Sequence, residues 1–129
     1  MLRRVTPTTI QAPFAKYSHG TVVPSDARWL YVSGQLGIRA DGTIPDDFEA
    51  QAEVCFENVL AILAEAGMDA GDLVRINSYL VDEGDVSAYM AVRDRYVIEP
   101  PPASTLLIVR ALVRPQFRIE VEAVAARSV

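Results

Sequence analysis

The pattern of apolar and polar positions predicts two strands near the start of the chain. Residues 17–23 form a short run that ends at the turn cluster Pro24-Ser25-Asp26, and residues 29–33 are rich in aromatic and β-branched side chains. Residues 34–47 contain three glycines and a proline. We therefore expect that segment to form a loop rather than to continue the strand.

A long amphipathic helix is predicted from about residue 47 to residue 66. Apolar residues recur there at spacings of three and four, which gathers them on one stripe of a helix. Asp46 and Glu49 have the form of a capping box at its start. Gly67 is typical of the residue that follows the end of a helix.

Three further strands and a second helix are predicted in the remaining chain. Residues 73–81 alternate between apolar and polar, and residues 86–97 repeat with helical spacing. Residues 103–109 are almost continuously apolar, which is typical of a central strand. Residues 117–125 alternate again, and Arg114-Pro115-Gln116 before them is interpreted as a hairpin turn.

This order of elements predicts one α+β domain over residues 1–129, in which two helices cover one face of a single mixed sheet. The other face then carries polar side chains among apolar ones. They are Arg75, Asn77, Arg118, Glu120 and Glu122. A face that is only partly polar suggests that it meets other subunits.

Composition and charge narrow the functional classes. The chain has 129 residues, of which 50% are hydrophobic and 22% charged, and its formal net charge is −5. This composition argues against disorder, and the net negative charge does not indicate the basic surface that binds nucleic acid. One cysteine and one histidine exclude an intrachain disulfide and His- or Cys-rich metal sites. No apolar run can span a membrane, so we expect a soluble cytoplasmic protein with no membrane partner.

Glu120 and Glu122 are the first candidates for chemistry. Alternate residues of a strand share one face and lie roughly 6.6 Å apart. Two partly desolvated carboxylates so close together favour acid–base work, because neighbouring negative charges hold a proton more tightly. The alternative is a solvated strand edge on which Arg118 balances the charges.

Other polar residues lie beside the first predicted strands. Tyr17 could donate to a ligand carbonyl and His19 could act as a base, although ordinary hydrogen bonding explains both. Ser33-Gly34 could let the backbone approach a ligand, and the alternative is an ordinary turn. On the long helix, Cys55 falls in the apolar stripe and is interpreted as a core residue rather than a nucleophile. Gln51, on the same helix, is expected to tie it to a loop.

Taken together, these stretches resemble the reactive intermediate deaminase family (RidA/YjgF, also labelled L-PSP endoribonuclease). The resemblance runs from about residue 13 to residue 127. The matching stretches are Tyr17-Ser18-His19-Gly20, Leu30-Tyr31-Val32-Ser33-Gly34-Gln35, Asp41-Gly42-Thr43-Ile44-Pro45, Gln51, Asn58-Val59, Leu63, Ala66-Gly67, Pro102-Ala103 and Arg118 to Ala125. No single stretch is decisive, but their order and spacing together are specific.

The resemblance implies a chorismate-mutase-like fold that forms a homotrimer through the open face of the sheet. It also implies a small-molecule ligand in three clefts between subunits, with no cofactor and no metal. Archetypal members hydrolyse reactive enamines and imines made from amino acids to keto acids and ammonia, and for this chain we expect carbonyl compounds and ammonia.

Carried over residue by residue, the resemblance makes Glu120 the group that acts on water. Tyr17, Ser33 and Gly34 match residues that line the cleft. The chain departs from the family at Ser104, where active members carry an arginine that grips the substrate carboxylate, and at Met90, where asparagine is frequent.

The loss of that arginine leaves open which residues bind the ligand in its place. Ser104 and Thr105 could bind a neutral ligand. Arg110 lies roughly 20 Å further along the same strand and cannot serve the same pocket. Arg93, on the second predicted helix, could approach from elsewhere.

Two functional hypotheses follow. The first is an enzyme that hydrolyses enamines or imines of an altered class, and the second is a trimer that binds a small metabolite without turnover. A nuclease is disfavoured by the acidic charge and by the absence of a basic, aromatic groove. In a trimer, Glu120 and Ser104 are expected to line one cleft with Tyr17 of a neighbouring subunit.

Overall fold

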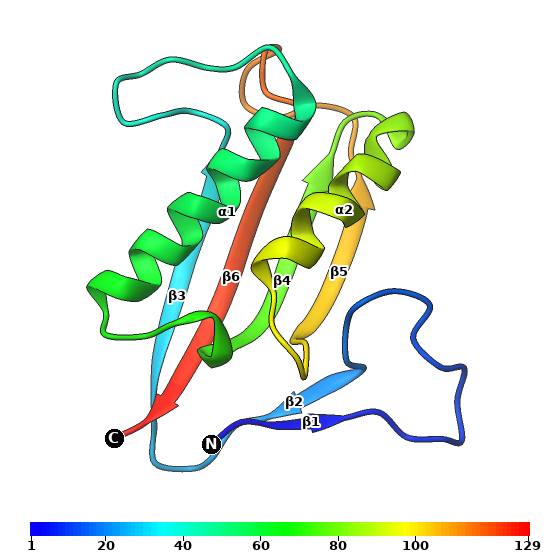
Figure 1. Ribbon diagram of the computed structural model, residues 1–129, viewed down its shortest axis with the longest axis vertical. Coiled ribbons are helices and arrows are strands. Elements are labelled where there is room, and N and C mark those ends of the chain that lie inside the picture. The colour runs from blue at the N-terminus through cyan, green and yellow to red at the C-terminus, as the bar shows by residue number, and fades with distance from the viewer.

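A computed structural model describes all residues from 1 to 129 as a four-stranded sheet with two helices across one face and a small two-stranded sheet beside it (Figure 1). The strands are β1 (Arg3–Val5), β2 (Gly20–Val22), β3 (Ala27–Leu36), β4 (Leu73–Leu80), β5 (Ala103–Ile108) and β6 (Ile119–Ser128). The α-helices are α1 (Phe48–Glu65) and α2 (Val86–Tyr96), and short 3-10 turns at Ala70–Asp72 and Glu83–Asp85 precede β4 and α2. The α+β class and the helices on one face are as predicted.

The strand order of the main sheet is β3-β6-β4-β5. Strand β6 pairs antiparallel with both β3 and β4, whereas β4 and β5 are parallel and joined through α2. The prediction that residues 103–109 form a central strand is therefore wrong, because β5 lies at the edge. The hairpin predicted at residues 114–116 is wrong for the same reason: β4 lies between β5 and β6, so the turn there belongs to a longer connection.

The N-terminal third also differs from the prediction. The strand expected at residues 17–23 is reduced to β2, which pairs with β1, a three-residue strand that the sequence pattern did not reveal. Strand β3 continues past residue 33 to Leu36 through a break in register between Val32 and Gln35. Such a bulge lets a strand continue through a glycine-containing segment that resembles a loop in sequence.

Helix α1 lies within one residue of its predicted limits, with one correction at its start. The capping residue is Asp47, not Asp46, and its carboxylate accepts a hydrogen bond of 3.0 Å from the backbone N–H of Ala50. Gly67 ends the helix with a φ of 73°, a left-handed conformation that favours glycine.

The core fills the space between the two helices and the sheet. From the sheet it takes Val32 of β3 and alternate residues of β6 and of β4 from Ile76 onward, which confirms the predicted periods of two there; a break in register between Leu73 and Arg75 places Leu73 in the core as well. Its fully buried members include Ala52, Cys55, Leu63, Ile76, Leu80, Tyr89, Val92, Ile119, Val121 and Ala125. None of the helices combines the length and hydrophobicity that a bilayer crossing requires.

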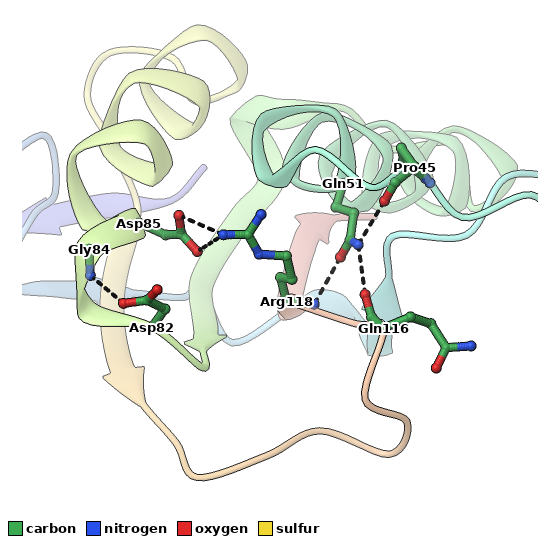
Figure 2. Close-up of polar contacts among 7 residues, drawn as sticks. All are labelled: Pro45, Gln51, Asp82, Gly84, Asp85, Gln116 and Arg118. Atoms are coloured by element: carbon green, nitrogen blue, oxygen red, sulfur yellow. Dashed lines mark hydrogen bonds and ion pairs between the residues drawn. The ribbon is translucent and has the colours of Figure 1, made fainter.

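A buried amide joins the start of α1 to both neighbouring loops (Figure 2). The Nε2 of Gln51 donates to the carbonyl oxygens of Pro45, at 2.8 Å, and Gln116, at 2.9 Å, and its Oε1 accepts from the backbone N–H of Arg118 at 2.9 Å. The guanidinium of Arg118 in turn donates to Asp85 at 2.9 Å, just before α2. The predicted role of Gln51 in tying helix to loop is confirmed.

The Gln51 network predicts a specific stability loss. Replacing Gln51 by Leu leaves two part-buried carbonyls and one N–H without their partner, so the free energy of unfolding should fall by about 2–4 kcal/mol. Urea denaturation followed by circular dichroism measures this loss. Asn58→Ala, on the same helix, is the matched control and should lower it by no more than about 1 kcal/mol. Equal losses for the two variants would contradict the role given to Gln51.

Candidate functional site

Glu120 lies on the face of the sheet that the helices leave open. Its neighbours along β6, Ile119 and Val121, are fully buried beneath the helices, so the two-residue period places its side chain on the opposite face. There it lines a cavity of about 330 Å³, which we call the Glu120 cavity. The other residues of this cavity are Gly34, Tyr79, Val109, Ala111, Leu112 and Glu122.

Gly34 is the residue that makes room for this carboxylate. A Cβ atom at position 34 would lie 1.9 Å from Oε2 of Glu120 and 2.7 Å from its Cδ. Only glycine permits so close an approach. The bulge at the end of β3 thus brings bare backbone against the carboxylate of β6.

The two carboxylates of β6 are in different chemical situations. The hydroxyl of Tyr79 donates to Oε1 of Glu122 at 2.5 Å, and this hydrogen bond is the largest cause of a raised pKa at Tyr79. Glu120 has no hydrogen-bond or ion-pair partner, although it is half-buried. Arg118, which was expected to balance both charges, is engaged by Asp85 instead. Glu120 is therefore the carboxylate that is free to bind water or a ligand.

A second cavity of about 370 Å³ lies between the edge strand β5, helix α2 and the segment before β2. We call it the Ser104 cavity. It brings together four of the predicted site residues, Tyr17, Met90, Ser104 and Thr105. Its other lining residues are Phe14, Ala15, Val86, Arg93 and Leu106. Six of the nine are hydrophobic, and none is acidic.

Five lining residues were not assigned to the site from the sequence, and two of them, Phe14 and Arg93, could contact a ligand through an aromatic ring or a charge. Phe14 packs edge-on against Tyr17, with ring centroids 6.0 Å apart, and no periodicity or motif singled it out. Arg93 was left open as a replacement for the lost arginine, and its side chain reaches this cavity from α2. Arg110, as argued from its distance along the strand, is not among the lining residues.

Within one chain the candidate residues fall into two groups. Ser104 pairs with the buried Ile76 across β4 and so faces the helices, whereas Glu120 faces the open side. The two residues cannot share a cavity within one chain. Tyr17, expected to come from a neighbour, lies with Ser104 in the same chain. Ser33 lines neither cavity, and its carbonyl oxygen accepts from the side chain of Gln35 at 3.0 Å.

The remaining candidates have structural roles. His19 is tied through Nε2 to the carbonyl oxygen of Gln11 at 2.7 Å and lines neither cavity. Cys55 is fully buried, and burial raises the pKa of its thiol to about 12, which keeps it protonated and unreactive. It is a core residue, as interpreted. No three His, Cys, Asp or Glu side chains lie close enough together to hold a metal ion.

Comparison with known proteins agrees with this arrangement of strands and helices. The family model described as Endoribonuclease L-PSP matches residues 9–127. Over 76% of this chain and 79% of its own length, the 2-iminobutanoate/2-iminopropanoate deaminase of Escherichia coli is 31% identical. Protein DfrA of Myxococcus xanthus is 35% identical over 89% of both chains.

The chain belongs to the RidA/YjgF family. The crystal structure of YyfB from Yersinia pestis, a protein of the conserved Rid family, superposes with a TM-score of 0.85 at 27% identity, covering 98% of each chain. The shared RidA/YjgF fold therefore includes the elements that carry both cavities: β3, β5, β6 and α2.

The contact between Gly34 and Glu120 predicts the effect of a single methyl group. In Gly34→Ala the carboxylate of Glu120 must move by about 1 Å or more, because Cβ atoms essentially never approach other heavy atoms within 3.0 Å. The obstacle is the end of a flexible side chain, so the free energy of unfolding should change by less than about 1 kcal/mol. A crystal structure and a denaturation curve of the variant measure the two effects.

Gly20→Ala is the matched control, because the nearest atom to its new Cβ is 3.8 Å away. It should leave Glu120 in place. An unmoved carboxylate in Gly34→Ala would show that the close approach does not position Glu120.

Proposed function

We propose that this RidA-family protein hydrolyses small enamines or imines to carbonyl compounds and ammonia, and that it does so as a homotrimer with its sites between subunits. No metal or cofactor takes part in the reaction. The deaminase name of its Escherichia coli relative supports the reaction class. The observation that carries the proposal is the unpaired carboxylate of Glu120, held against Gly34 in an open cavity.

That carboxylate is suited to activate water. As the water oxygen adds to the C=N carbon, Glu120 accepts one of its protons, and the imine nitrogen takes up a proton. The proton on the imine nitrogen comes from solvent. In the resulting carbinolamine the proton held by Glu120 passes to the amine nitrogen, the C–N bond breaks to release ammonia, and the hydroxyl proton returns to solvent as the C=O bond forms. One imine and one water give one carbonyl compound and one ammonia. An enamine enters the same sequence after protonation at carbon.

A trimer would join the two cavities that one chain keeps apart. The Ser104 cavity opens at the edge strand β5, and the Glu120 cavity opens on the uncovered face. That face also exposes Trp29 and Tyr31, whose rings stack with centroids 6.3 Å apart and whose exposed fractions are 50% and 75%. Leu107 on β5 adds to this apolar surface at 50% exposed. Such a surface is typical of a subunit interface.

The second candidate is a trimer that binds a small metabolite without turnover. It is favoured by the lining of the Ser104 cavity, which contains no carboxylate and no histidine and has serine where the family resemblance leads us to expect an arginine. Thermal stabilisation by a ligand that is recovered unchanged, with no hydrolysis of any imine, would favour this candidate over the enzyme.

The catalytic proposal predicts a large effect of Glu120→Gln. The purified protein should accelerate the disappearance of imines released in solution by an amino-acid oxidase, and Glu120→Gln should slow this by at least about 100-fold. Trapping the remaining imine with semicarbazide measures the rate. Glu65→Gln, an exposed acid at the end of α1, is the control and should keep the wild-type rate. Full activity in Glu120→Gln, or none in the wild type, would contradict the proposal.

The trimer predicts a mass in solution of about three times the 14.1 kDa of the chain. Light scattering during size-exclusion chromatography measures it. Tyr31→Glu puts a charge on the open face and should shift the protein towards monomer, because an unpaired charge is costly in an interface. Ile98→Glu, at a 49% exposed residue away from that face, should leave the mass unchanged. A monomeric wild type would contradict the assembly.

A further inference from the structure

Arg93 is the least expected residue in the Ser104 cavity. It lies on α2 among the buried residues of that helix, and its side chain is only 3% exposed. A guanidinium keeps its positive charge in proteins, and its burial is costly unless an anion compensates it. The charge partners of Arg93 therefore decide what this residue does.

Only one acidic group compensates Arg93, and it does so incompletely. Nε and Nη2 both donate to the same oxygen, Oδ1 of Asp94, at 3.2 and 3.1 Å. The side chain of Asp94 is 44% exposed, so water screens much of its charge. The ring of Tyr89, with its centroid 5.7 Å from the guanidinium carbon, adds a weaker cation–π contact.

The rest of the guanidinium is available to a ligand. Two of its five N–H groups are used by Asp94, so even with a hydrogen bond to the hydroxyl of Tyr89 at least two remain. No polar side-chain atom in the structure is both sealed from solvent and unpartnered, so a guanidinium nitrogen without a partner is not sealed from solvent. Arg93 is among the residues that line the Ser104 cavity, so a ligand in this cavity lies beside that residue.

The surroundings favour an anion at this point. No acidic side chain lines the cavity, and the hydroxyl-bearing residues Tyr17 and Ser104 lie on its other walls, whereas the hydroxyl of Thr105 accepts a hydrogen bond of 3.1 Å from Arg75. Nearby, Lys16 donates to the carbonyl oxygens of Asp94 and Val97 and so adds positive charge at the end of α2. The other lining side chains are apolar, which suits a small hydrocarbon body.

We propose that Arg93 is the anion-binding residue of this cavity and selects ligands that carry a carboxylate. The family resemblance leads us to expect an arginine at position 104 of β5, where this chain has serine. Arg93 supplies a positive charge from α2 instead. A planar guanidinium with free donors on adjacent nitrogens binds a carboxylate through two hydrogen bonds. The inference rests on the function proposed above only in taking this cavity as part of the site, and it makes Arg93 a specificity-determining residue for that reaction.

Binding of an unreactive probe tests the assignment without any need for turnover. The probes are 2-oxobutanoate and its uncharged amide, which differ at the carboxyl group, and isothermal titration calorimetry measures both. The wild type should bind the carboxylate more tightly than the amide by at least about tenfold. Arg93→Gln should remove that preference by weakening carboxylate binding alone.

Arg95→Gln is the matched control. It removes the same charge two residues away on α2, where Arg95 is half-exposed and pairs with Glu53 on α1. It should leave the affinity for both probes unchanged. The proposal is overturned if Arg93→Gln keeps the preference, if the wild type does not distinguish the probes, or if neither probe binds at its highest soluble concentration.

A second measurement covers the case in which Arg93→Gln does not fold. The guanidinium ¹⁵N signals of Arg93 in the wild type, identified by their loss in Arg93→Lys, should shift on addition of 2-oxobutanoate and stay in place with the amide. Signals that ignore the carboxylate would overturn the proposal.

The outcomes also separate this inference from the proposed function. The proposed function would stand and the role of Arg93 would fall in either of two cases. In the first, the wild type hydrolyses imines without preferring carboxylated ones. In the second, it prefers them and Arg93→Gln retains that preference. Carboxylate binding that depends on Arg93, without consumption of any imine, would do the reverse and favour the binding trimer.

Discussion

The two-residue period of β6 is the constraint on which the remaining structure depends. Ile119, Val121 and Ala125 are buried under the helices, so Glu120 and Glu122 must face the other way. A slip of one residue would bury two carboxylates and expose the core. The hydrogen bond from the backbone of Arg118 to Gln51 helps to hold the register where the strand begins (Figure 2). The position of the candidate catalytic group is thus a consequence of how the core is packed.

The same constraint separates the two halves of the site. Strand β5 lies next to β4 in register, so Ser104 shares the helix-covered face with Ile76, and the sheet itself stands between Ser104 and Glu120. Each chain therefore presents an acidic cavity on one side and a cavity with a buried cation on the other. Neither holds both groups that the proposed reaction uses. Association of copies of this chain is the simplest way to bring them together, and the mixed character of the open face is consistent with that.

Much of this fold could be predicted from the sequence, because the spacing of apolar residues distinguishes a helix from a strand and shows which of its faces is buried. Helix α1 and strand β6 are the longest of the patterned elements, and their buried faces are as expected. The order of the strands was less accessible. A continuous apolar run is equally compatible with a central strand and with a parallel edge strand covered by a helix, and β5 is the latter. Strand β1 has three residues, too few to show a period.

For the candidate site, the sequence indicates individual residues but not which of them come into contact. Glu120 and Gly34 could be named from the resemblance, but their contact depends on a bulge that resembles a loop in sequence. The meeting of Tyr17 with Ser104 depends on the path of the N-terminal segment, which no spacing reveals. Arg93 did leave a signal, since an arginine at or beside the apolar stripe of a helix is unusual. That signal marks the residue but not the direction of its side chain.

The charges of the two cavities together determine how a ligand is oriented. A ligand whose carboxylate pairs with Arg93 has its other end directed away from the buried cation, along an apolar wall. In the proposed assembly that end meets Glu120 of another copy, which supplies a base. A carboxylate in the reverse orientation would face Glu120 and be repelled. Separation of the cation and the base onto different chains therefore orients the ligand as well as binding it, and a neutral ligand would lack that orientation.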